Sequence, residues 1–368
     1  MIRVIELFSG IGAQRMALTL EKIPHKVVAI SEIDPHALAS YEAIWGDCPN
    51  LGDITNIDRL PPADLVTYSF PCQDLSIAGK RKGMGPGTRS GLVWEVIRLL
   101  KAYEESERPE WLLMENVPLV VSSPLWPDLL KNLQDLGYFN SWDTLDSSDY
   151  GSPQKRIRTF MVSRLHVPPY DFPEKKEGPR KCIRDIMEPN CPKEYIRRIP
   201  FNDVVWRKDH ISGSTPIAAD STRGFYSRKS LYSPDLLAPT VTAYHGGNFR
   251  IKVIADWDNP HTIEQMRRLY SLDGLCPVIM SNGDSTNRVK VVVDADNCLI
   301  CRDLSPLECW RLMGFPDWAY NKASTVSSRA QLYTQVGNSI VVEVLRAIFS
   351  SIFVSPRKVQ RTLEEAWA

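Results

Sequence analysis

The chain has 368 residues, of which 43% are hydrophobic and 24% charged, and its 44 lysines and arginines balance its 44 acidic residues. This length and composition fit one large or two moderate domains with a sizeable core, and they exclude a disordered chain. The apolar run before Ser9 is too short for a signal peptide and no apolar stretch reaches membrane-spanning length. We therefore expect a cytoplasmic protein without a membrane partner, with its eight cysteines as free thiols.

The first 165 residues alternate short apolar segments with segments of helical periodicity. Strands are expected at residues 4–8, 27–31, 65–70, 111–115 and 158–163, and helices at residues 13–21, 35–45, 92–104 and 125–136. This alternation is typical of a parallel sheet with helices on its faces. The predicted fold class is therefore α/β.

Residues 168–296 have a different character. They are rich in Pro, Gly, Ser, Asn and Arg and lack long helical periodicity, which indicates a smaller domain of irregular and β structure. Helical patterning returns at residues 305–313 and 338–353. We therefore expect residues 1–165 and 305–368 to form one domain, and residues 166–304 to form the second.

The second domain contains an internal repeat. The segment LYSPDLLAP at residues 231–239 matches LYSLDGLCP at residues 269–277, and the match resumes at residues 250–253 and 288–291, always at an offset of 38 positions (271 − 233 = 38). Nine identities over 23 positions exceed what a shared β-turn-β preference would produce. We interpret residues 231–253 (the first unit) and 269–291 (the second unit) as a duplication.

A glycine-containing turn, FSGIG, follows the first expected strand. Gly10 and Gly12 allow a tight turn and bring backbone N–H groups close to a ligand at the start of a helix. Glu32, 20 positions after Gly12 (32 − 12 = 20), is placed to accept hydrogen bonds from ribose hydroxyls. The pattern fits a nicotinamide cofactor, S-adenosylmethionine or no ligand. The lack of a third glycine and the aromatic Phe8, which can stack on adenine, favour S-adenosylmethionine. Asp53, expected after a further short strand, would read the adenine amino group.

Three kinds of chemical group are expected at one edge of the sheet. Cys72 follows Pro71 where a strand meets a loop, Glu115 ends the next strand, and Arg156 and Arg158 alternate in QKRIR, so that in extended backbone they point to one side. A thiolate can add to carbon 6 of cytosine and make carbon 5 nucleophilic. Glu115 would act as the acid at ring nitrogen N3, and Arg158 would hold oxygen O2 and favour the thiolate. Core packing would explain one buried cysteine, but not all of these groups together.

In chain order the sequence carries FSGIG, EID, GDI, FPCQDLS, GKRKG, ENV, QKRIR, RDLSPLEC and QVGNSI, from residue 8 to residue 340. In order and spacing these motifs resemble the DNA cytosine-5 methyltransferase family, in its bacterial and phage modification-type members. The resemblance implies a Rossmann-like S-adenosylmethionine-dependent methyltransferase domain and a smaller target-recognition domain. It also implies a target base flipped out of double-stranded DNA and a covalent adduct with Cys72.

The resemblance further implies which residues make contacts. Cofactor contacts are expected from Phe8, Ser9, Gly10, Gly12, Glu32, Ile33, Asp53, Ile54, Pro71, Asn338 and Ser339. The loop at residues 73–91 is expected to close on DNA through Gln73, Ser76, Lys80, Arg81 and Lys82, and the loops of the two units through Tyr244, His245, Asn282 and Asn287. Residues 302–308 are expected to organise the recognition domain. We expect no metal at Cys298 and Cys301, because no second Cys/His pair lies at a suitable spacing.

Several alternatives stay open. An RNA-methylating branch of the family shares the catalytic motifs but lacks a long recognition segment. A DNA-binding module without catalytic activity would be expected to have lost at least one catalytic motif, and no motif is broken in this sequence. A nicotinamide oxidoreductase would have no common use for Cys72, Glu115 and Arg158.

The two units could give two target sequences, read one site jointly, or be a duplication within one recognition fold. We expect a monomer. A restriction endonuclease sharing the target site would be its partner in a restriction-modification system, whereas an orphan or phage-protection enzyme would have none.

Overall fold

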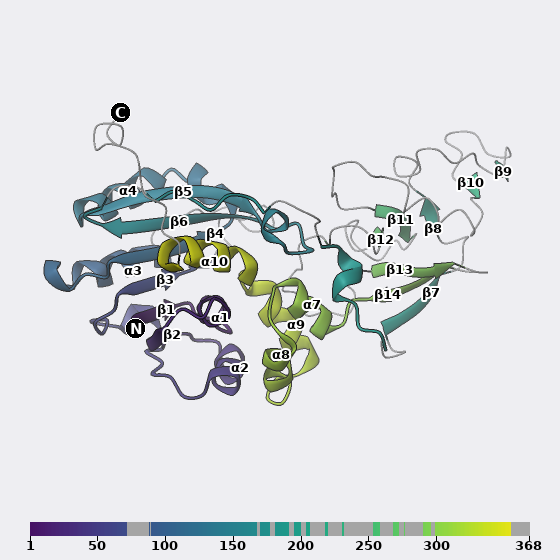
Figure 1. Ribbon diagram of the computed structural model, residues 1–368, viewed down its shortest axis with the longest axis horizontal. Coiled ribbons are helices and arrows are strands. Elements are labelled where there is room, and N and C mark those ends of the chain that lie inside the picture. Colours follow the sequence, from purple (N-terminus) through teal and green to yellow (C-terminus); the bar gives the residue numbers. More distant parts are fainter. Residues whose placement is uncertain are drawn as a thin grey trace.

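The computed structural model describes residues 1–71, 88, 90–167, 170–176, 181–190, 195–199, 204–206, 218–219, 230–231, 253–257, 268–271, 276, 290–295 and 299–354. Within these residues, two six-stranded sheets form the main architecture, and helices near the C-terminal end lie between them (Figure 1).

The first sheet contains β1 (Ile2–Leu7), β2 (His25–Ser31), β3 (Leu65–Tyr68), β4 (Trp111–Asn116), β5 (Tyr138–Asp146) and β6 (Ile157–Leu165). Its order is β2-β1-β3-β4-β6-β5, with β1 parallel to β2 and β3, and β3 parallel to β4. The predicted parallel sheet is correct for these four strands and wrong for β6, which runs antiparallel to both β4 and β5. The sequence pattern missed β5, because only two of the nine residues of this edge strand are buried and it lacks the apolar patterning of the central strands.

Helices cover both faces of this sheet (Figure 1). They are α1 (Ala13–Leu20), α2 (Pro35–Trp45), α3 (Val93–Lys101), α4 (Trp126–Asp135) and α10 (Val342–Phe349). Successive strand residues point to opposite faces, so Val4 packs in the core cluster that includes α1 and α10, and Ile5 in the cluster that includes α3 and α4. The four helices predicted before residue 140 are confirmed. The predicted bounds of α2 match because Asp34 caps its first turn and Pro35 starts the helix.

The C-terminal part of the chain adds α7 (Pro306–Leu312), α8 (Asp317–Ala323) and α9 (Arg329–Asn338). Asn338 ends α9 and Ser339 is its C-cap, so the prediction that a helix begins at residue 338 is wrong. By length and apolar composition residues 329–354 could cross a membrane. However, they form two helices separated at Ser339 and followed by a π-helical turn at Ser350–Val354. The buried residues of these helices belong to the core on the first sheet, which identifies them as core helices.

The second sheet contains β7 (Ile196–Ile199), β8 (Val204–Trp206), β11 (Val253–Trp257), β12 (Arg268–Ser271), β13 (Lys290–Ala295) and β14 (Leu299–Asp303). Its order is β7-β14-β13-β12-β11-β8, and only β12 and β13 are parallel among its described pairs. A separate pair joins β9 (Ala218–Ala219) and β10 (Ser230–Leu231). Short 3-10 helices lie at Ile54–Asn56, Ser90–Leu92, Glu105–Glu107, Pro118–Ser122, Ser147–Tyr150 and Ile183–Ile186.

The segment between the two sheets lies along the first one. Tyr170 and Phe172 pack against its core, and Ile183 and Ile186 are buried in the same cluster as α10. The predicted domain boundary at residue 166 therefore falls before a stretch that contributes to the core of the first sheet. The division into residues 1–165 with 305–368, and 166–304, stays a prediction.

Candidate active site at the carboxyl edge of the first sheet

The turn between β1 and α1 has left-handed backbone at Phe8 (φ 58°), Gly10 (φ 54°) and Gly12 (φ 80°). A Cβ atom at Gly12 would lie 2.6 Å from Nε1 of Trp45 and 2.8 Å from the ring of Tyr41. A side chain is thus excluded at Gly12 by its neighbours as well as by its backbone. Gly10, in contrast, has no atom within 4 Å of its Cβ position. Such open space beside a glycine allows close approach of a ligand.

Glu32 connects this turn to the end of β2. Its carboxylate accepts hydrogen bonds from the N–H groups of Gly10 (2.8 Å), Ile33 (2.9 Å) and Asp34 (2.8 Å). The adjacent Ile33 is 72% exposed, an unusual position for a large apolar side chain. The two predicted cofactor residues at the end of β2 therefore present a carboxylate and an apolar surface beside the glycine turn.

Asp53 and Ile54 differ in what they can offer a cofactor. Asp53 Oδ1 accepts hydrogen bonds from the backbone N–H (2.9 Å) and the hydroxyl (2.8 Å) of Thr55, and these bonds lower the pKa of Asp53. The side chain of Ile54 is buried in the core, so only its backbone can face a ligand. The strand expected before Asp53 is absent from this described stretch, where Asn50 forms only an isolated bridge with Ile30.

The buried Glu115 and the partly buried Arg158 form an ion pair at the site. Glu115 lies at the end of β4 with 8% of its surface exposed, and its Oε1 is 3.3 Å from Nε of Arg158 on β6. Burial raises the pKa of Glu115, and the charges of Arg158 and then Arg156 lower it in part. A buried carboxyl group with a raised pKa can remain protonated at a higher pH than an exposed one, which suits a proton donor.

Arg156 has a different position from Arg158. It is 5% exposed, and its Nη2 donates hydrogen bonds to the backbone carbonyls of Gly337 (3.1 Å) and Ser339 (2.9 Å). These bonds hold the turn between α9 and α10, where the side chain of Asn338 is exposed. The structure thus brings predicted cofactor residues Asn338 and Ser339 next to the loop that carries Arg156 and leads into β6.

Two hydrogen bonds hold the chain just before the predicted nucleophile. Asn116 donates a hydrogen bond from Nδ2 to the carbonyl of Phe70 (3.0 Å), and the Ser90 hydroxyl donates to the carbonyl of Pro71 (2.7 Å). Both contacts precede residue 72 directly, so they orient the chain where it leaves the edge of the sheet. The predicted residues Cys72, Gln73, Ser76, Lys80, Arg81, Lys82, Tyr244, His245, Asn282, Asn287 and Cys298 lie outside the described residues.

The sequence interpretation missed Glu6 and Tyr41. Glu6 is fully buried on β1, and its carboxylate accepts hydrogen bonds from the N–H of Arg15 (2.8 Å) and the hydroxyl of Tyr41 (2.7 Å). Burial raises the pKa of Glu6, and these two hydrogen bonds counteract part of that increase. The available signal was an acidic residue within an apolar strand, two positions before the glycine turn begins.

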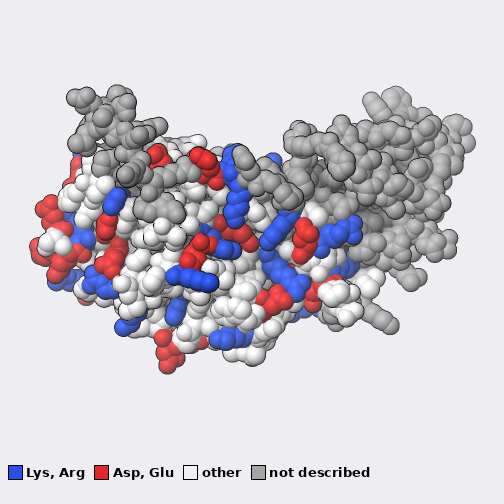
Figure 2. All heavy atoms as spheres, in the orientation of Figure 1, with Lys and Arg blue, Asp and Glu red and all other residues white. Residues whose placement is uncertain are grey.

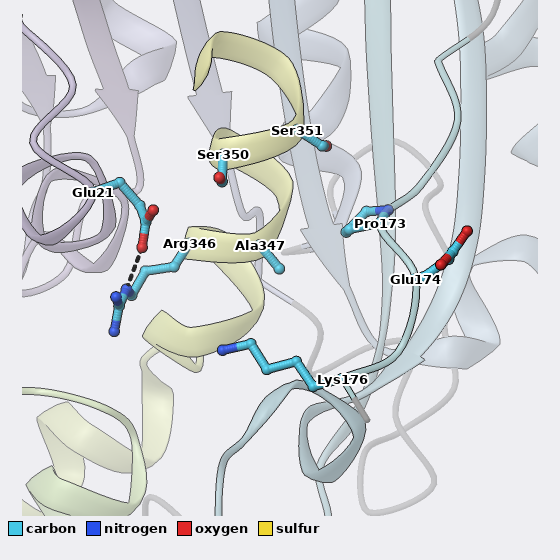
Figure 3. A pocket seen from close by; sticks show the side chains of 8 residues that line it. All are labelled: Glu21, Pro173, Glu174, Lys176, Arg346, Ala347, Ser350 and Ser351. Carbon is cyan, nitrogen blue, oxygen red and sulfur yellow. Dashed lines mark hydrogen bonds and ion pairs between the residues drawn. The ribbon is translucent and has the colours of Figure 1, made fainter. Parts of the chain in front are cut away.

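On the face shown in Figure 2, positively and negatively charged side chains are intermixed over the described residues. A shallow groove of about 320 Å³ lies beside α10, where Arg346 pairs with Glu21 at 2.7 Å and Lys176 extends from the segment opposite (Figure 3). Its remaining lining residues are Pro173, Glu174, Ala347, Ser350 and Ser351. None of the predicted site residues lines this groove.

Comparison with known proteins identifies the family. A model of the C-5 cytosine-specific DNA methylase family matches residues 2–354. The chain is 30% identical to the type II methyltransferase M2.ScrFI of Lactococcus lactis subsp. cremoris, covering 96% of this chain and 100% of that protein. It is also 30% identical to the type II methyltransferase M.HhaI of Haemophilus parahaemolyticus, covering 95% and 94%. The structure of the S. pombe Dnmt2 methyltransferase aligns with 97% of this chain and 99% of its own at a TM-score of 0.65 and 20% identity, which confirms the predicted fold class alone. The chain belongs to the C-5 cytosine-specific DNA methylase family, and it is a DNA cytosine-5 methyltransferase.

Proposed function

We propose that the enzyme transfers a methyl group from S-adenosylmethionine to carbon 5 of cytosine in specific sequences of double-stranded DNA, through a covalent Cys72 adduct on a flipped-out base. The observation that carries this proposal is the ion pair of Glu115 and Arg158, 3.3 Å apart, at the sheet edge. The neighbouring strand, β3, leads to Phe70 and Pro71 at the same edge, and these two residues directly precede Cys72 in the sequence.

The chemistry divides between three side chains. The thiolate of Cys72 adds to carbon 6 while Glu115 gives its proton to ring nitrogen N3, so no isolated negative charge accumulates on the ring. Arg158 binds oxygen O2 and stabilises the developing charge. Carbon 5 then takes the methyl group that S-adenosylmethionine supplies. Loss of the carbon 5 proton to a base, breakage of the carbon 6–sulfur bond and return of the N3 proton to Glu115 would regenerate the thiolate and the protonated carboxyl group and release the methylated cytosine.

The described residues fit the cofactor. The Ser9 hydroxyl is buried and, within the described structure, has no hydrogen-bond partner, so it is available to a ligand. Gly10 leaves open space, and Ile33 offers an exposed apolar surface for adenine. Glu32 would accept from the ribose hydroxyls, Asp53 would read the adenine amino group, and Phe8, Gly12, Ile54, Pro71, Asn338 and Ser339 would line the rest.

Duplex DNA would bind across this edge. The basic loop with Lys80, Arg81 and Lys82 would contact phosphates, and the loops of the two units would contact bases. We further propose a monomeric, cytoplasmic enzyme, since one base is flipped in each event. The type II names of M2.ScrFI and M.HhaI favour a restriction endonuclease as partner. Two target sequences and one jointly read site stay alternatives for the repeat.

The test is bisulfite sequencing of unmethylated DNA of mixed sequence, incubated with the protein and S-adenosylmethionine. We expect protection at one or two short motifs, loss of protection in Cys72→Ser, and normal protection in Cys48→Ser, a half-buried free thiol elsewhere in the fold. Protection in Cys72→Ser would refute the covalent mechanism. Absence of protection in the wild type, together with methylation of RNA, would move the assignment to the RNA-methylating branch.

A further inference from the structure

The two repeat units have different surroundings at equivalent positions. Leu231, at the start of the first unit, pairs with Ala218 in the separate two-stranded sheet. Its counterpart Leu269, at the start of the second unit, pairs with Lys290 inside the six-stranded sheet. The equivalent residues Leu231 and Leu269 therefore lie in different sheets.

The second unit is joined to the catalytic loop by backbone hydrogen bonds. The N–H of Cys276 donates to the carbonyl of Pro153 (2.8 Å), and the N–H of Lys155 donates to the carbonyl of Cys276 (2.9 Å). The bridge formed around Gln154 is parallel, as between strands of one sheet. Cys276 is fully buried and Tyr270 is 4% exposed, and both pack in the core cluster of the first sheet. The second unit is thus partly built into the catalytic domain.

The loop held by Cys276 carries Arg156 and leads directly into β6, which carries Arg158. Lys155 precedes Arg156, whose guanidinium holds the carbonyls of Gly337 and Ser339. Two residues further on, Arg158 pairs with Glu115. A shift of the Pro153 to Lys155 backbone would therefore change the position of Arg158 against Glu115, and displacements of about 1 Å can cost a reaction on the order of a hundredfold in rate.

The second unit is also held where it returns to the catalytic domain. Its last two residues begin β13, which pairs with β14, and Arg302 on β14 is 4% exposed and bonded to the buried carboxylate of Glu308 on α7. Tyr333 on α9 donates a hydrogen bond to the carbonyl of Leu304 (2.6 Å), just after β14. Both ends of the second unit are consequently anchored to elements that surround the site.

We infer that the second unit is a positioning element of the active site, in which the backbone of Cys276 sets the loop that presents Arg158 to Glu115, whereas the first unit is dispensable for the chemical step. This inference rests on the proposed roles of Glu115 and Arg158. It makes the two units unequal: the second would be required for every methylation event, and the first would influence only which DNA is bound.

The test compares Cys276→Pro, which removes one donor of the bridge, with Ala238→Pro at the equivalent position of the first unit (276 − 38 = 238). We expect Cys276→Pro to lower the single-turnover methylation rate at saturating DNA and saturating S-adenosylmethionine by about tenfold or more. Ala238→Pro should keep the rate. Cys276→Ala, which retains both backbone hydrogen bonds, should restore the rate to near that of the wild type.

Hydrogen exchange separates this inference from the proposed function. The Lys155 amide should exchange faster in Cys276→Pro than in the wild type or in Ala238→Pro, whether or not the protein methylates DNA. Unchanged exchange and rate in Cys276→Pro would overturn the inference, and so would an equal loss of rate in Ala238→Pro. A wild type that methylates no cytosine would refute the proposed function, while the exchange comparison would still decide whether Cys276 holds the loop.

Discussion

Burial and a neighbouring positive charge shift the pKa of Glu115 in opposite directions. Burial disfavours its charge and raises its pKa, while the guanidinium of Arg158 stabilises the charge and lowers the pKa. A proton donor must be protonated at the start of each cycle, so activity is present below the pKa of Glu115 and is lost as the pH rises through it. The raised pKa extends the active range toward neutral pH.

Two substitutions test this account. Glu115→Gln can still donate a hydrogen bond but cannot transfer a proton, and we expect kcat to fall by about 10²- to 10⁴-fold. Arg158→Leu removes the nearest positive charge and should raise the pKa of Glu115 further. The alkaline limb of the kcat profile should then move to higher pH, although the rate itself falls. A limb that moves to lower pH would contradict the assignment of Glu115 as the acid.

The two glycines of the cofactor turn provide a matched pair. Both have left-handed backbone, but only the Cβ position of Gly12 collides with neighbours, Trp45 and Tyr41. We expect Gly10→Ala to lower the free energy of unfolding by roughly 1–2 kcal/mol, the cost of left-handed backbone alone. Gly12→Ala should cost more because α2 must move. Urea unfolding measures both, and equal losses would show that the contact with Tyr41 and Trp45 does not constrain the turn.

Among the elements, the loop before β6 has a structural and a chemical role. Arg156 is buried and bonded to two carbonyls between α9 and α10. Arg156→Met would leave these carbonyls without their donor, and we expect a loss of about 2–3 kcal/mol in unfolding free energy together with weaker S-adenosylhomocysteine binding. The control is Arg164→Met, whose partly exposed pair with Glu110 should contribute less than about 1 kcal/mol. Equal effects of the two substitutions on cofactor binding would contradict the role of Arg156.

The sequence predicted the elements with strong periodicity and missed those without it. β1 to β4 and α1 to α4 have continuous apolar patterns or clear caps, as with Asp34 before α2. The edge strand β5 has no such pattern, and α9 is only weakly amphipathic, although Ser328 and Gln331 form a capping box at its start. The direction of β6 could not be read, because antiparallel pairing depends on how β5 and β6 meet and not on their composition.

At the site, motif spacing predicted Glu32, Glu115 and Arg158 at the same edge of the sheet, and the structure places them at its strand ends. Motif spacing could not reveal which other side chains hold the elements of the site in place. Ser40 of α2 donates a hydrogen bond to Gln335 of α9, 295 positions away, and Arg156 reaches carbonyls more than 180 positions away. Contacts at such separations leave no local pattern in one sequence, so only the fold shows them.

For the molecule as a whole, the repeat gives a prediction about DNA specificity. Replacing residues 243–249, or separately residues 281–287, with Gly and Ser should remove base contacts of one unit while keeping its strands. If the units read separate sequences, each replacement should abolish one protected motif in bisulfite sequencing and leave the other. If they read one site jointly, either replacement should relax the same motif. An unchanged set of protected motifs in both variants would exclude base reading by these loops.

The position of α10 has a consequence for how the protein reaches its folded state. This helix covers the same face of the first sheet as α1, and Arg346 on it pairs with Glu21, 325 positions earlier. Until α10 leaves the ribosome, part of this apolar face of the first sheet stays uncovered. It stays uncovered while the whole recognition segment is synthesised. Closure of such a long loop is slow, and exposed apolar surface favours aggregation. We therefore expect yield of the native protein to depend strongly on synthesis rate and chaperones, more than its final stability would suggest.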